Sequence, residues 1–426
     1  MTRARLDALR GARAAIAAEV RAHVGAGAPH RAPDDAARVE RYLGELELGF
    51  RGWAQRGATR LLRPVLGAVF APPVGAGADD GLDARLEVGG DVATVAAVGA
   101  DALVFAPTHG ANLDAIVLGL ALERLGLPPA LYLAGEHLYR NPLVGRLMGP
   151  LGAVRIDRAR ADRRYLAVLA AYVAALAARG AALTIFPGAT RRRDGTLEHD
   201  LRLGLIAAAA RAAAAQGRRL HVVPVTINLQ IVLEAAWLVD YHLRGRGHER
   251  VVGDELFVPG RLAATARRLR ALDQRAVLRF GAPIACDRRL DVDGLAAALR
   301  GAYRAGAVFL DTHVVGRALD DLRVAARGRA IPAGAVGALA WPRAEVERAV
   351  AATAAHLDRH PADGARWRPA RPVAAIVDGA LAAWRGGHPT PAARAAGDAI
   401  KLIEPRLAWF YANRTRHVGT PGGGGG

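Results

Sequence analysis

Apolar residues recur along the chain at two different periods, which predict different kinds of structure. Near the start they follow every third or fourth residue, as in an amphipathic helix: Leu6, Leu9, Ala12, Ile16, Val20 and Val24. The same spacing begins again at Asp34 and continues, less regularly, to about Phe70. The stretch 71–81 is rich in Pro and Gly and is typical of a linker. We therefore expect residues 1–81 to form a helical region that ends in a linker.

From about residue 90, short apolar runs rich in β-branched residues alternate with longer helical patterns. The predicted strands are 102–107, 130–134, 153–156, 182–186, 221–227 and 276–280. The helical patterns between them cover 113–125, 159–179 and 201–216. Strands that alternate with helices predict an α/β domain, here residues 82–295, with a mixed, largely parallel sheet flanked by helices. Ligands of such sheets bind at the loops that leave the carboxyl ends of the strands.

After about residue 295 the strand signals fade and Ala-rich helical stretches return. We expect a helical C-terminal region over 296–420 and a flexible glycine tail over 421–426. The longest uncharged apolar run without Gly or Pro is Tyr165 to Ala178, which is too short to span a bilayer. The first residues also lack the apolar core of a secretory signal. We therefore expect no transmembrane helix and no signal peptide.

Composition excludes several kinds of chemistry. The chain has no serine, so it cannot be a Ser-His-Asp hydrolase. Its only lysine, Lys401, follows Ile400, so there is no G-x-x-x-x-G-K-[ST] phosphate loop. Its only cysteine, Cys286, allows neither an internal disulfide nor a zinc site with several thiolates.

The net charge of +18 leaves two interpretations open. A compositional bias toward Arg and Ala would explain the charge together with the missing Lys and Ser. An anionic partner, such as a nucleic acid, an anionic lipid or a phosphorylated substrate, would explain it equally well. The positions of the arginines must decide between them.

The first candidate site follows the predicted strand 102–107. His109 lies in the loop and Asp114 in the first turn of the next helix, an H-x4-D spacing. The carboxylate can accept a hydrogen bond from one ring nitrogen and raise the basicity of the other, which makes the imidazole a general base for a hydroxyl. A second match, His30 to Asp35, lies in a connector with no strand before it, and we interpret it as a chance match.

Arginines cluster after two further predicted strands. Gly152 precedes one of them, which contains Arg155 and ends just before Arg158. Arg191, Arg192 and Arg193 follow another strand on a turn of Gly188, Ala189 and Thr190. One guanidinium group can donate two parallel hydrogen bonds to phosphate oxygens, so these arginines form a candidate anion site. The simpler alternative is a run of solvated arginines. A fourth segment, Val223-Pro224-Val225, lies within a further strand.

In order and spacing, these four segments resemble the glycerolipid acyltransferase family, and its glycerol-3-phosphate 1-O-acyltransferase branch in particular. The family has an H-x4-D block, a G-x-x-F-I-x-R block, an F-P-E-G-T-R-S-like block and a V-P-V block. Three more stretches, 229–239, 279–284 and 406–414, are similar to stretches of that branch.

The resemblance implies a glycerol-phosphate acyltransferase-like fold and the transfer of an acyl chain from acyl-CoA or acyl carrier protein to the sn-1 hydroxyl of glycerol 3-phosphate. His109 would deprotonate the hydroxyl and Asp114 would orient His109. Arg158 and Arg191 would bind the phosphate, and Arg155, Arg192 and Arg193 belong to the same phosphate-binding set. Four residues would support the motifs: Gly152, Gly188, Thr190 and Pro224. The resemblance implies no cofactor and no metal. It implies a peripheral position on an anionic membrane surface, at the cytoplasmic face of the inner or plasma membrane.

The sequence departs from the family pattern mainly in the third block. Gly188 stands where a glutamate is usual, Ala189 replaces a glycine and Arg192 replaces a serine, while Arg155 replaces an aromatic residue of the second block. Two alternatives therefore stay open: another acceptor, such as 1-acylglycerol 3-phosphate or dihydroxyacetone phosphate, or a non-catalytic homologue that binds lipid or acyl carrier. Nucleic acid is not expected as a partner, because no recognised motif appears and aromatic residues are only 5%. His356 and His360 have no third ligand at a suitable spacing, so they predict no metal site.

Overall fold

The fold is known from a computed structural model. It describes residues 8–9, 11–26, 34–46, 85–99, 101–135, 152–157, 160, 162–244, 274–330, 339–360, 365–366 and 371–419. The predicted continuation of the second helix to Phe70, the linker at 71–81 and the glycine tail at 421–426 lie outside these residues.

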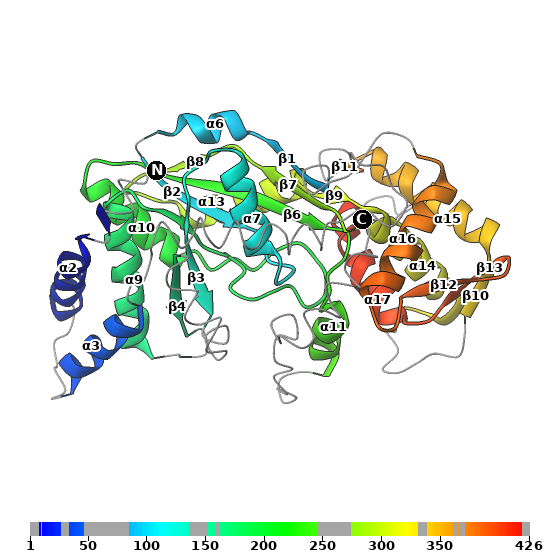
Figure 1. Ribbon diagram of the computed structural model, residues 1–426, viewed down its shortest axis with the longest axis horizontal. Helices are drawn as coiled ribbons and strands as arrows, with labels where there is room; N and C mark the ends of the chain where they lie inside the picture. Colours follow the sequence, from blue (N-terminus) through cyan, green and yellow to red (C-terminus); the bar gives the residue numbers. More distant parts are fainter. Residues whose placement is uncertain are drawn as a thin grey trace.

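An eight-stranded sheet forms the centre of the molecule (Figure 1). Its main path runs β1 (Leu86–Gly90), β7 (Ala276–Phe280), β6 (Leu220–Leu229), β2 (Ala102–Pro107), β5 (Ala182–Thr184), β3 (Leu131–Gly135) and β4 (Ala153–Ile156), and β8 (Ile284–Cys286) also pairs with β6. Strand β6 is antiparallel to β7 and β8, and every other pair in this sheet is parallel. The predicted mixed, largely parallel sheet is confirmed.

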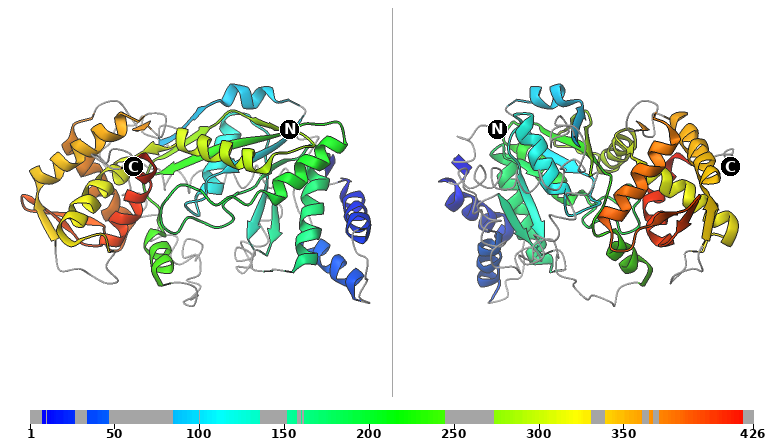
Figure 2. Two further views of the ribbon diagram at one scale, coloured as in Figure 1. Left: turned by 180° about the vertical axis from the view of Figure 1, so that it is seen from behind. Right: turned by 45° about the vertical axis from the view of Figure 1, so that its right-hand side comes forward.

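Helices cover both faces of this sheet because its central strands are apolar on both sides. In β2, Leu103 and Phe105 belong to one buried cluster, whereas Val104 and its alanine neighbours belong to another. The first cluster includes α7 (Asp114–Arg124), and the second includes α9 (Arg163–Ala178), α10 (Gly204–Ala215) and α13 (Val292–Ala305). Figure 2 shows α13 lying across the back of the sheet, opposite α7. The remaining helices of this part are α6 (Val92–Ala97) and α11 (Ala235–Arg244).

The N-terminal helices α2 (Arg13–Ala26) and α3 (Asp35–Leu46) pack against α9 at one end of the sheet (Figure 1). Asp162 fixes this contact. Its carboxylate caps α9 by accepting from the N–H of Arg164 at 2.9 Å, and it also accepts from Arg38 at 2.6 Å and from the hydroxyl of Tyr42. One acidic side chain thus starts α9 and attaches α3 to it.

The C-terminal region contains the expected helices and, in addition, a small sheet. The helices are α14 (Asp311–Arg327), α15 (Arg343–Asp358), α16 (Val373–Gly387), α17 (Pro405–Asn413) and the short 3₁₀ helix η4 (Arg416–Val418). Strands β10 (Leu339–Pro342), β13 (Ala399–Leu402) and β12 (Ala393–Ala396) pair antiparallel, and β9 (Val308–Phe309) pairs with β11 (Ala365–Arg366). The sequence did not predict these strands, because segments of two to four residues are too short to show an alternating pattern.

Among the described residues, no helix combines the length and the apolar character that crossing a membrane requires.

The contacts of Asp162 predict a pH-dependent contribution to stability. The Tyr42 hydroxyl, the Arg164 N–H and Arg38 lower the pKa of Asp162 to about 2, although burial opposes them. Because the folded pKa lies below the unfolded value of about 3.9, the contribution is present above pH 4 and is lost as the pH falls toward 2. We expect Asp162→Ala to lower the free energy of unfolding by about 1 kcal/mol at pH 7. Thermal melts of both proteins from pH 7 to pH 3 measure the difference, which should narrow below pH 4; a constant difference would contradict this assignment.

Candidate active site

The structure brings His109 and Asp114 together at the carboxyl end of β2. Thr108 anchors the loop between them to β6: its N–H donates to Val225 O at 2.9 Å, and its hydroxyl accepts from the N–H of Ile227 at 2.9 Å. Asp114 is the first residue of α7, and its Oδ2 lies 3.1 Å from Nδ1 of His109. The loop of the H-x4-D motif therefore folds back so that the His109 ring meets the Asp114 carboxylate, as predicted.

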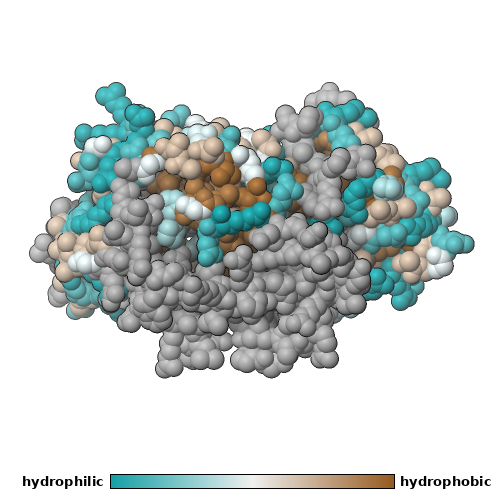
Figure 3. Space-filling view, turned by 45° about the horizontal axis from the view of Figure 1, so that its top comes forward, coloured by the Kyte–Doolittle hydropathy of each residue, from teal (hydrophilic) through white to brown (hydrophobic). Residues whose placement is uncertain are grey.

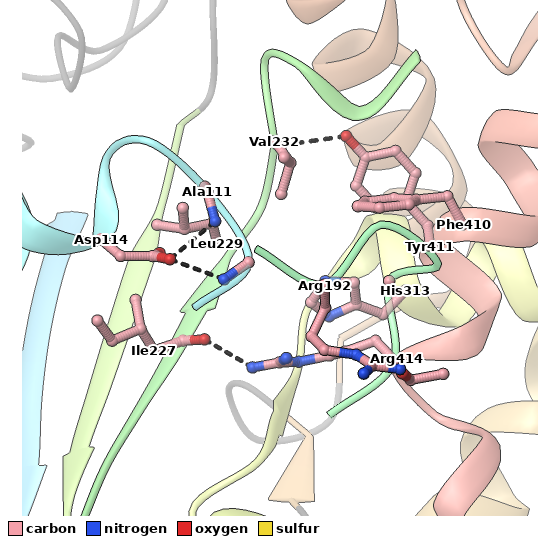
Figure 4. Close-up of a pocket in the computed structure, with 13 residues that line it drawn as sticks. Ala111, Asp114, Arg192, Ile227, Leu229, Val232, His313, Phe410, Tyr411 and Arg414 are labelled. Carbon is pink, nitrogen blue, oxygen red and sulfur yellow. Dashed lines mark hydrogen bonds between the residues drawn. The ribbon is translucent and has the colours of Figure 1, made fainter. Parts of the chain in front are cut away.

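Asp114 is buried, and its carboxylate accepts hydrogen bonds from the backbone of the loop that carries His109. The N–H groups of Gly110 and Ala111 both donate to its Oδ2, each at 2.7 Å (Figure 4). Burial raises the pKa of Asp114 to about 7, and the two N–H groups and the charges of Arg414 and Arg191 oppose the rise. The carboxyl group therefore gains or loses its proton near neutral pH, and these neighbours favour its ionised form.

The His109 ring has an ordered environment. Its side chain is 16% exposed, and the ring centroid lies 4.2 Å from that of Phe186, the residue that begins the third block. The backbone N–H of Arg192, in the same block, donates to His109 O at 2.8 Å. The first and third blocks therefore build one site from two loops.

The three arginines of the third block have specific partners, so they are not a solvated run. Arg191 donates to the side chain of Asn112 and lies 3.1 Å from Glu234 Oε1, with its guanidinium 5.5 Å from the centroid of the Trp237 ring. Arg193 lies 3.7 Å from the centroid of Tyr241.

Arg192 is held within its own loop. Its side chain donates to Asp194 at 2.9 Å and to Thr196 at 2.8 Å. The block thus presents three positive charges whose positions are set by acceptors and aromatic rings.

Two carboxyl groups that the sequence analysis did not single out complete the inner side of the site: Glu198 is buried, and the Glu234 side chain is 14% exposed. Glu234 accepts from the N–H of Asn112 at 2.6 Å, and Glu198 accepts from the N–H of His109. Burial raises the pKa of both, and the nearest arginine opposes it in each case: Arg191 for Glu234 and Arg414 for Glu198. Glu198 belongs to none of the recognised segments, and Glu234 lies in the similar stretch 229–239 but was not singled out, so only the fold reveals their contacts.

A pocket beside this loop is walled on its far side by the C-terminal region. Gly110, Ala111 and Asp114 lie on one side, while Phe410, Tyr411 and Arg414 lie on the other (Figure 4). The sequence had marked 406–414 only as a similar stretch in a separate region.

Arg414 reaches into the interior from the end of α17. It donates to Ile227 O at 2.6 Å and to the side chain of Asn228 at 3.2 Å. Burial lowers its pKa, and the charges of Glu198 and Asp114 oppose the decrease. The buried guanidinium therefore balances two of the carboxylates.

The third block also forms the seat of α17. Asn413 donates to Asp194 O at 2.7 Å. Gly195 has a φ of 77°, and a Cβ there would lie 2.1 Å from Phe410 O, so no side chain fits at this contact.

Other predicted residues lie elsewhere or outside the described part. Arg155 lies in β4, at the edge of the sheet and three strands from β2, and Gly152 directly precedes that strand. Arg158 is outside the described residues. Pro224 pairs with Ala106 of β2, in the strand beside the site. Cys286 is buried in β8, and burial raises the pKa of its thiol to about 11, so it is a poor nucleophile near neutral pH.

Comparisons with known proteins cover the residues that carry the four motifs. The acyltransferase family model matches residues 91–228. A glycerol-3-phosphate acyltransferase of Xanthomonas campestris pv. campestris is 32% identical over 185 residues, which are 43% of this chain and 20% of that protein. Another from Pseudomonas paraeruginosa is 31% identical over 194 residues, which are 44% of this chain and 22% of that protein. The chain thus spans about a fifth of the length of these relatives.

Among solved structures, a 1-acyl-sn-glycerophosphate acyltransferase from Thermotoga maritima is similar with a TM-score of 0.30 and 17% identity, over 51% of this chain and 69% of that one. A likeness at this score is too low to carry an argument about the site.

The turn of the third block makes a prediction about stability. Ala189 has a φ of 60°, the left-handed region that glycine adopts without strain. We expect Ala189→Gly to raise the free energy of unfolding by about 1 kcal/mol. Ala297→Gly, at an exposed position in α13, is the matched control and should lower it by about 0.5–1 kcal/mol. Equal destabilisation of both variants would show that the turn is unstrained.

Proposed function

We propose, from the match of residues 91–228 to the acyltransferase family model, that the protein transfers a fatty acyl chain from acyl-CoA or acyl carrier protein to the sn-1 hydroxyl of glycerol 3-phosphate. The product would be a 1-acylglycerol 3-phosphate. The observation that carries the proposal is the His109–Asp114 pair, with the carboxylate fixed by two backbone N–H groups at a strand's carboxyl end.

The geometry supports a direct transfer. With Asp114 ionised and accepting from Nδ1–H, Nε2 of His109 is the basic nitrogen and takes the proton of the hydroxyl as its oxygen attacks the thioester carbonyl. The tetrahedral intermediate then collapses, the C–S bond breaks, and the imidazolium returns the proton to the leaving thiolate. The chain has no serine, and Cys286 is buried with a raised pKa, so neither residue type suggests an acyl-enzyme intermediate.

The phosphate of the acceptor would bind the arginines of the third block, together with Arg158. A guanidinium has five N–H donors, so the contacts of Arg191 to Asn112 and Glu234 are compatible with phosphate binding. Arg192 lines the pocket beside Gly110 and Ala111, within the same loop system as His109. Because Arg192 stands in place of a serine, this block is more cationic than the family pattern.

Two other functions remain alternatives. The same chemistry could act on 1-acylglycerol 3-phosphate or dihydroxyacetone phosphate, and competition among acceptors separates these. A non-catalytic homologue that binds lipid or acyl carrier is favoured only by Gly188, and an inert protein that gained activity with glutamate there would support it.

The acyl donor and product have long apolar chains, so we also propose a peripheral position on an anionic membrane surface, at the cytoplasmic face of the inner or plasma membrane. The charge of +18 supports it. Figure 3 shows hydrophobic surface gathered in the middle of one face, between hydrophilic ends. Co-sedimentation should be stronger with vesicles that contain phosphatidylglycerol than with pure phosphatidylcholine vesicles, and equal sedimentation would argue against this position.

Replacing the base tests the reaction. We expect His109→Ala to lower the release of free thiol from acyl-CoA and glycerol 3-phosphate by about 10²- to 10⁴-fold, because no other group takes the hydroxyl proton. His221 is a matched control: it is also 16% exposed, and its Nε2 lies 3.1 Å from Asp101 Oδ2, but it lies outside the site. Its alanine variant should keep wild-type activity. Equal activity of wild type and His109→Ala would remove His109 from the mechanism.

Phosphate recognition is tested by comparing acceptors. Arg191→Lys keeps the charge but loses the planar fork, so we expect the KM for glycerol 3-phosphate to rise about tenfold while the KM for acyl-CoA is unchanged. Arg211→Lys, at an exposed position in α10, should change neither constant. If wild type used glycerol as well as glycerol 3-phosphate, the arginines would not be a phosphate site.

A further inference from the structure

Gly188, the main departure from the family pattern, lies against a glutamate ten residues further along the chain. A Cβ built on Gly188 would lie 3.0 Å from Cγ and 3.7 Å from Oε1 of Glu198. The loop between them turns back on itself, because the N–H of Arg202 donates to Pro187 O at 2.8 Å. The space that a side chain at 188 would need is therefore already used by the Glu198 side chain.

Glu198 acts on the loop of the proposed base. Its Oε1 accepts the backbone N–H of His109 itself, and the residue is only 3% exposed. Its Oε2 has no hydrogen-bond partner within the described part of the chain. Burying a carboxyl group while one of its oxygens has no hydrogen bond is costly, so its position against the N–H of His109 calls for a reason.

The charge of Glu198 interacts with other charged groups of the site. Burial raises the pKa of Glu198. The charge of Arg414 opposes this rise most strongly, and the hydrogen bond from the N–H of His109 opposes it next. Arg414 is in turn placed by α17 and by its contacts to Ile227 O and Asn228. The carboxyl group therefore accepts a hydrogen bond from the His109 loop and interacts electrostatically with Arg414 in the C-terminal wall of the pocket.

We propose that Glu198 is a positioning residue that supplies, from position 198, the carboxyl group that the family's third block has at 188. It fixes the backbone of His109, so that the imidazole meets Asp114. Gly188 then suits this arrangement, because a Cβ there would already crowd Cγ of Glu198 at 3.0 Å and a longer side chain would compete for the same space. The catalytic consequence rests on the function proposed above, whereas the structural consequence does not.

Four variants test this role, with two measurements on each: thiol release with acyl-CoA and glycerol 3-phosphate, and hydrogen exchange of the His109 amide. Glu198→Gln keeps an oxygen acceptor, and Glu198→Leu removes it at similar volume. Gly188→Glu places a second side chain in the occupied space. Gly188→Glu combined with Glu198→Gly moves the carboxyl group to the family position.

We expect Glu198→Gln to stay within about fivefold of wild type in both measurements, since its amide oxygen accepts the same N–H. Glu198→Leu should lower kcat about 100-fold, with little change in the KM for glycerol 3-phosphate, because the base is misplaced rather than the acceptor site. Its His109 amide should exchange at least about tenfold faster, as expected for the loss of one hydrogen bond. The double variant should be at least about tenfold more active than Gly188→Glu alone.

Two results would overturn the proposal: a Glu198→Leu protein with wild-type kcat and amide protection, or a double variant no better than Gly188→Glu. If Glu198→Leu does not fold, the role of Glu198 is still tested by comparing Glu198→Gln with the wild type and the double variant with Gly188→Glu. A merely structural role would lower the melting temperature without the split between kcat and KM. If the wild type itself releases no thiol, the function proposed above fails, and hydrogen exchange of the His109 amide still tests the role of Glu198 by itself.

Discussion

The site depends on a carboxyl group buried beneath the loop that carries its histidine. Asp114 accepts from two backbone N–H groups of that loop and from His109, so the loop's shape and the orientation of the imidazole are set by one side chain. Burying a carboxylate is costly unless it is paired, and Asp114 is accompanied by two further carboxyl groups, the buried Glu198 and the largely buried Glu234. Two arginines, Arg191 and Arg414, offset the three. With all five ionised and His109 neutral, the cluster has a charge of −1, so a proton on the imidazole brings it to zero. An environment of this kind stabilises the imidazolium that a general base becomes in the transition state.

This balance joins distant parts of the chain. Asp114 and Arg191 lie within the residues that match the acyltransferase family model, whereas Arg414 follows α17, almost two hundred residues beyond the end of that match. The C-terminal region thus contributes a wall of the pocket and one of the two positive charges that favour the ionised form of the carboxyl groups. Glu234, which pairs with Arg191, lies just past the matched residues and just before α11. Removal of the C-terminal region would therefore disturb the charges around His109 as well as the fold.

The sequence predicted the parts that short-range patterns determine. The bounds of β2, β4 and β7 were predicted at the residue, and the His109–Asp114 pair followed from its place between a strand and a helix. Strands β1 and β8 and the C-terminal sheet were missed, because short or Ala-rich segments show no alternation. Glu198 lies in none of the recognised segments, and Glu234 and Arg414 lie in stretches marked only as similar to the family branch, so their roles at the site were not predicted. Each is defined by a long-range contact to the His109 loop or to β6, and a single Glu or Arg has no sequence signature of its own.

The pH dependence of kcat/KM for thiol release tests most directly whether this buried pair is the base. Asp114 has its pKa raised to about 7 and must be ionised to hold His109 in the reactive tautomer. We predict that kcat/KM of the wild type rises with pH to a plateau, with a midpoint near pH 7. In Asp114→Asn, kcat/KM should stay low at every pH and show no midpoint near 7. A rate independent of pH between 5.5 and 8.5, or an unchanged profile in Asp114→Asn, would contradict it.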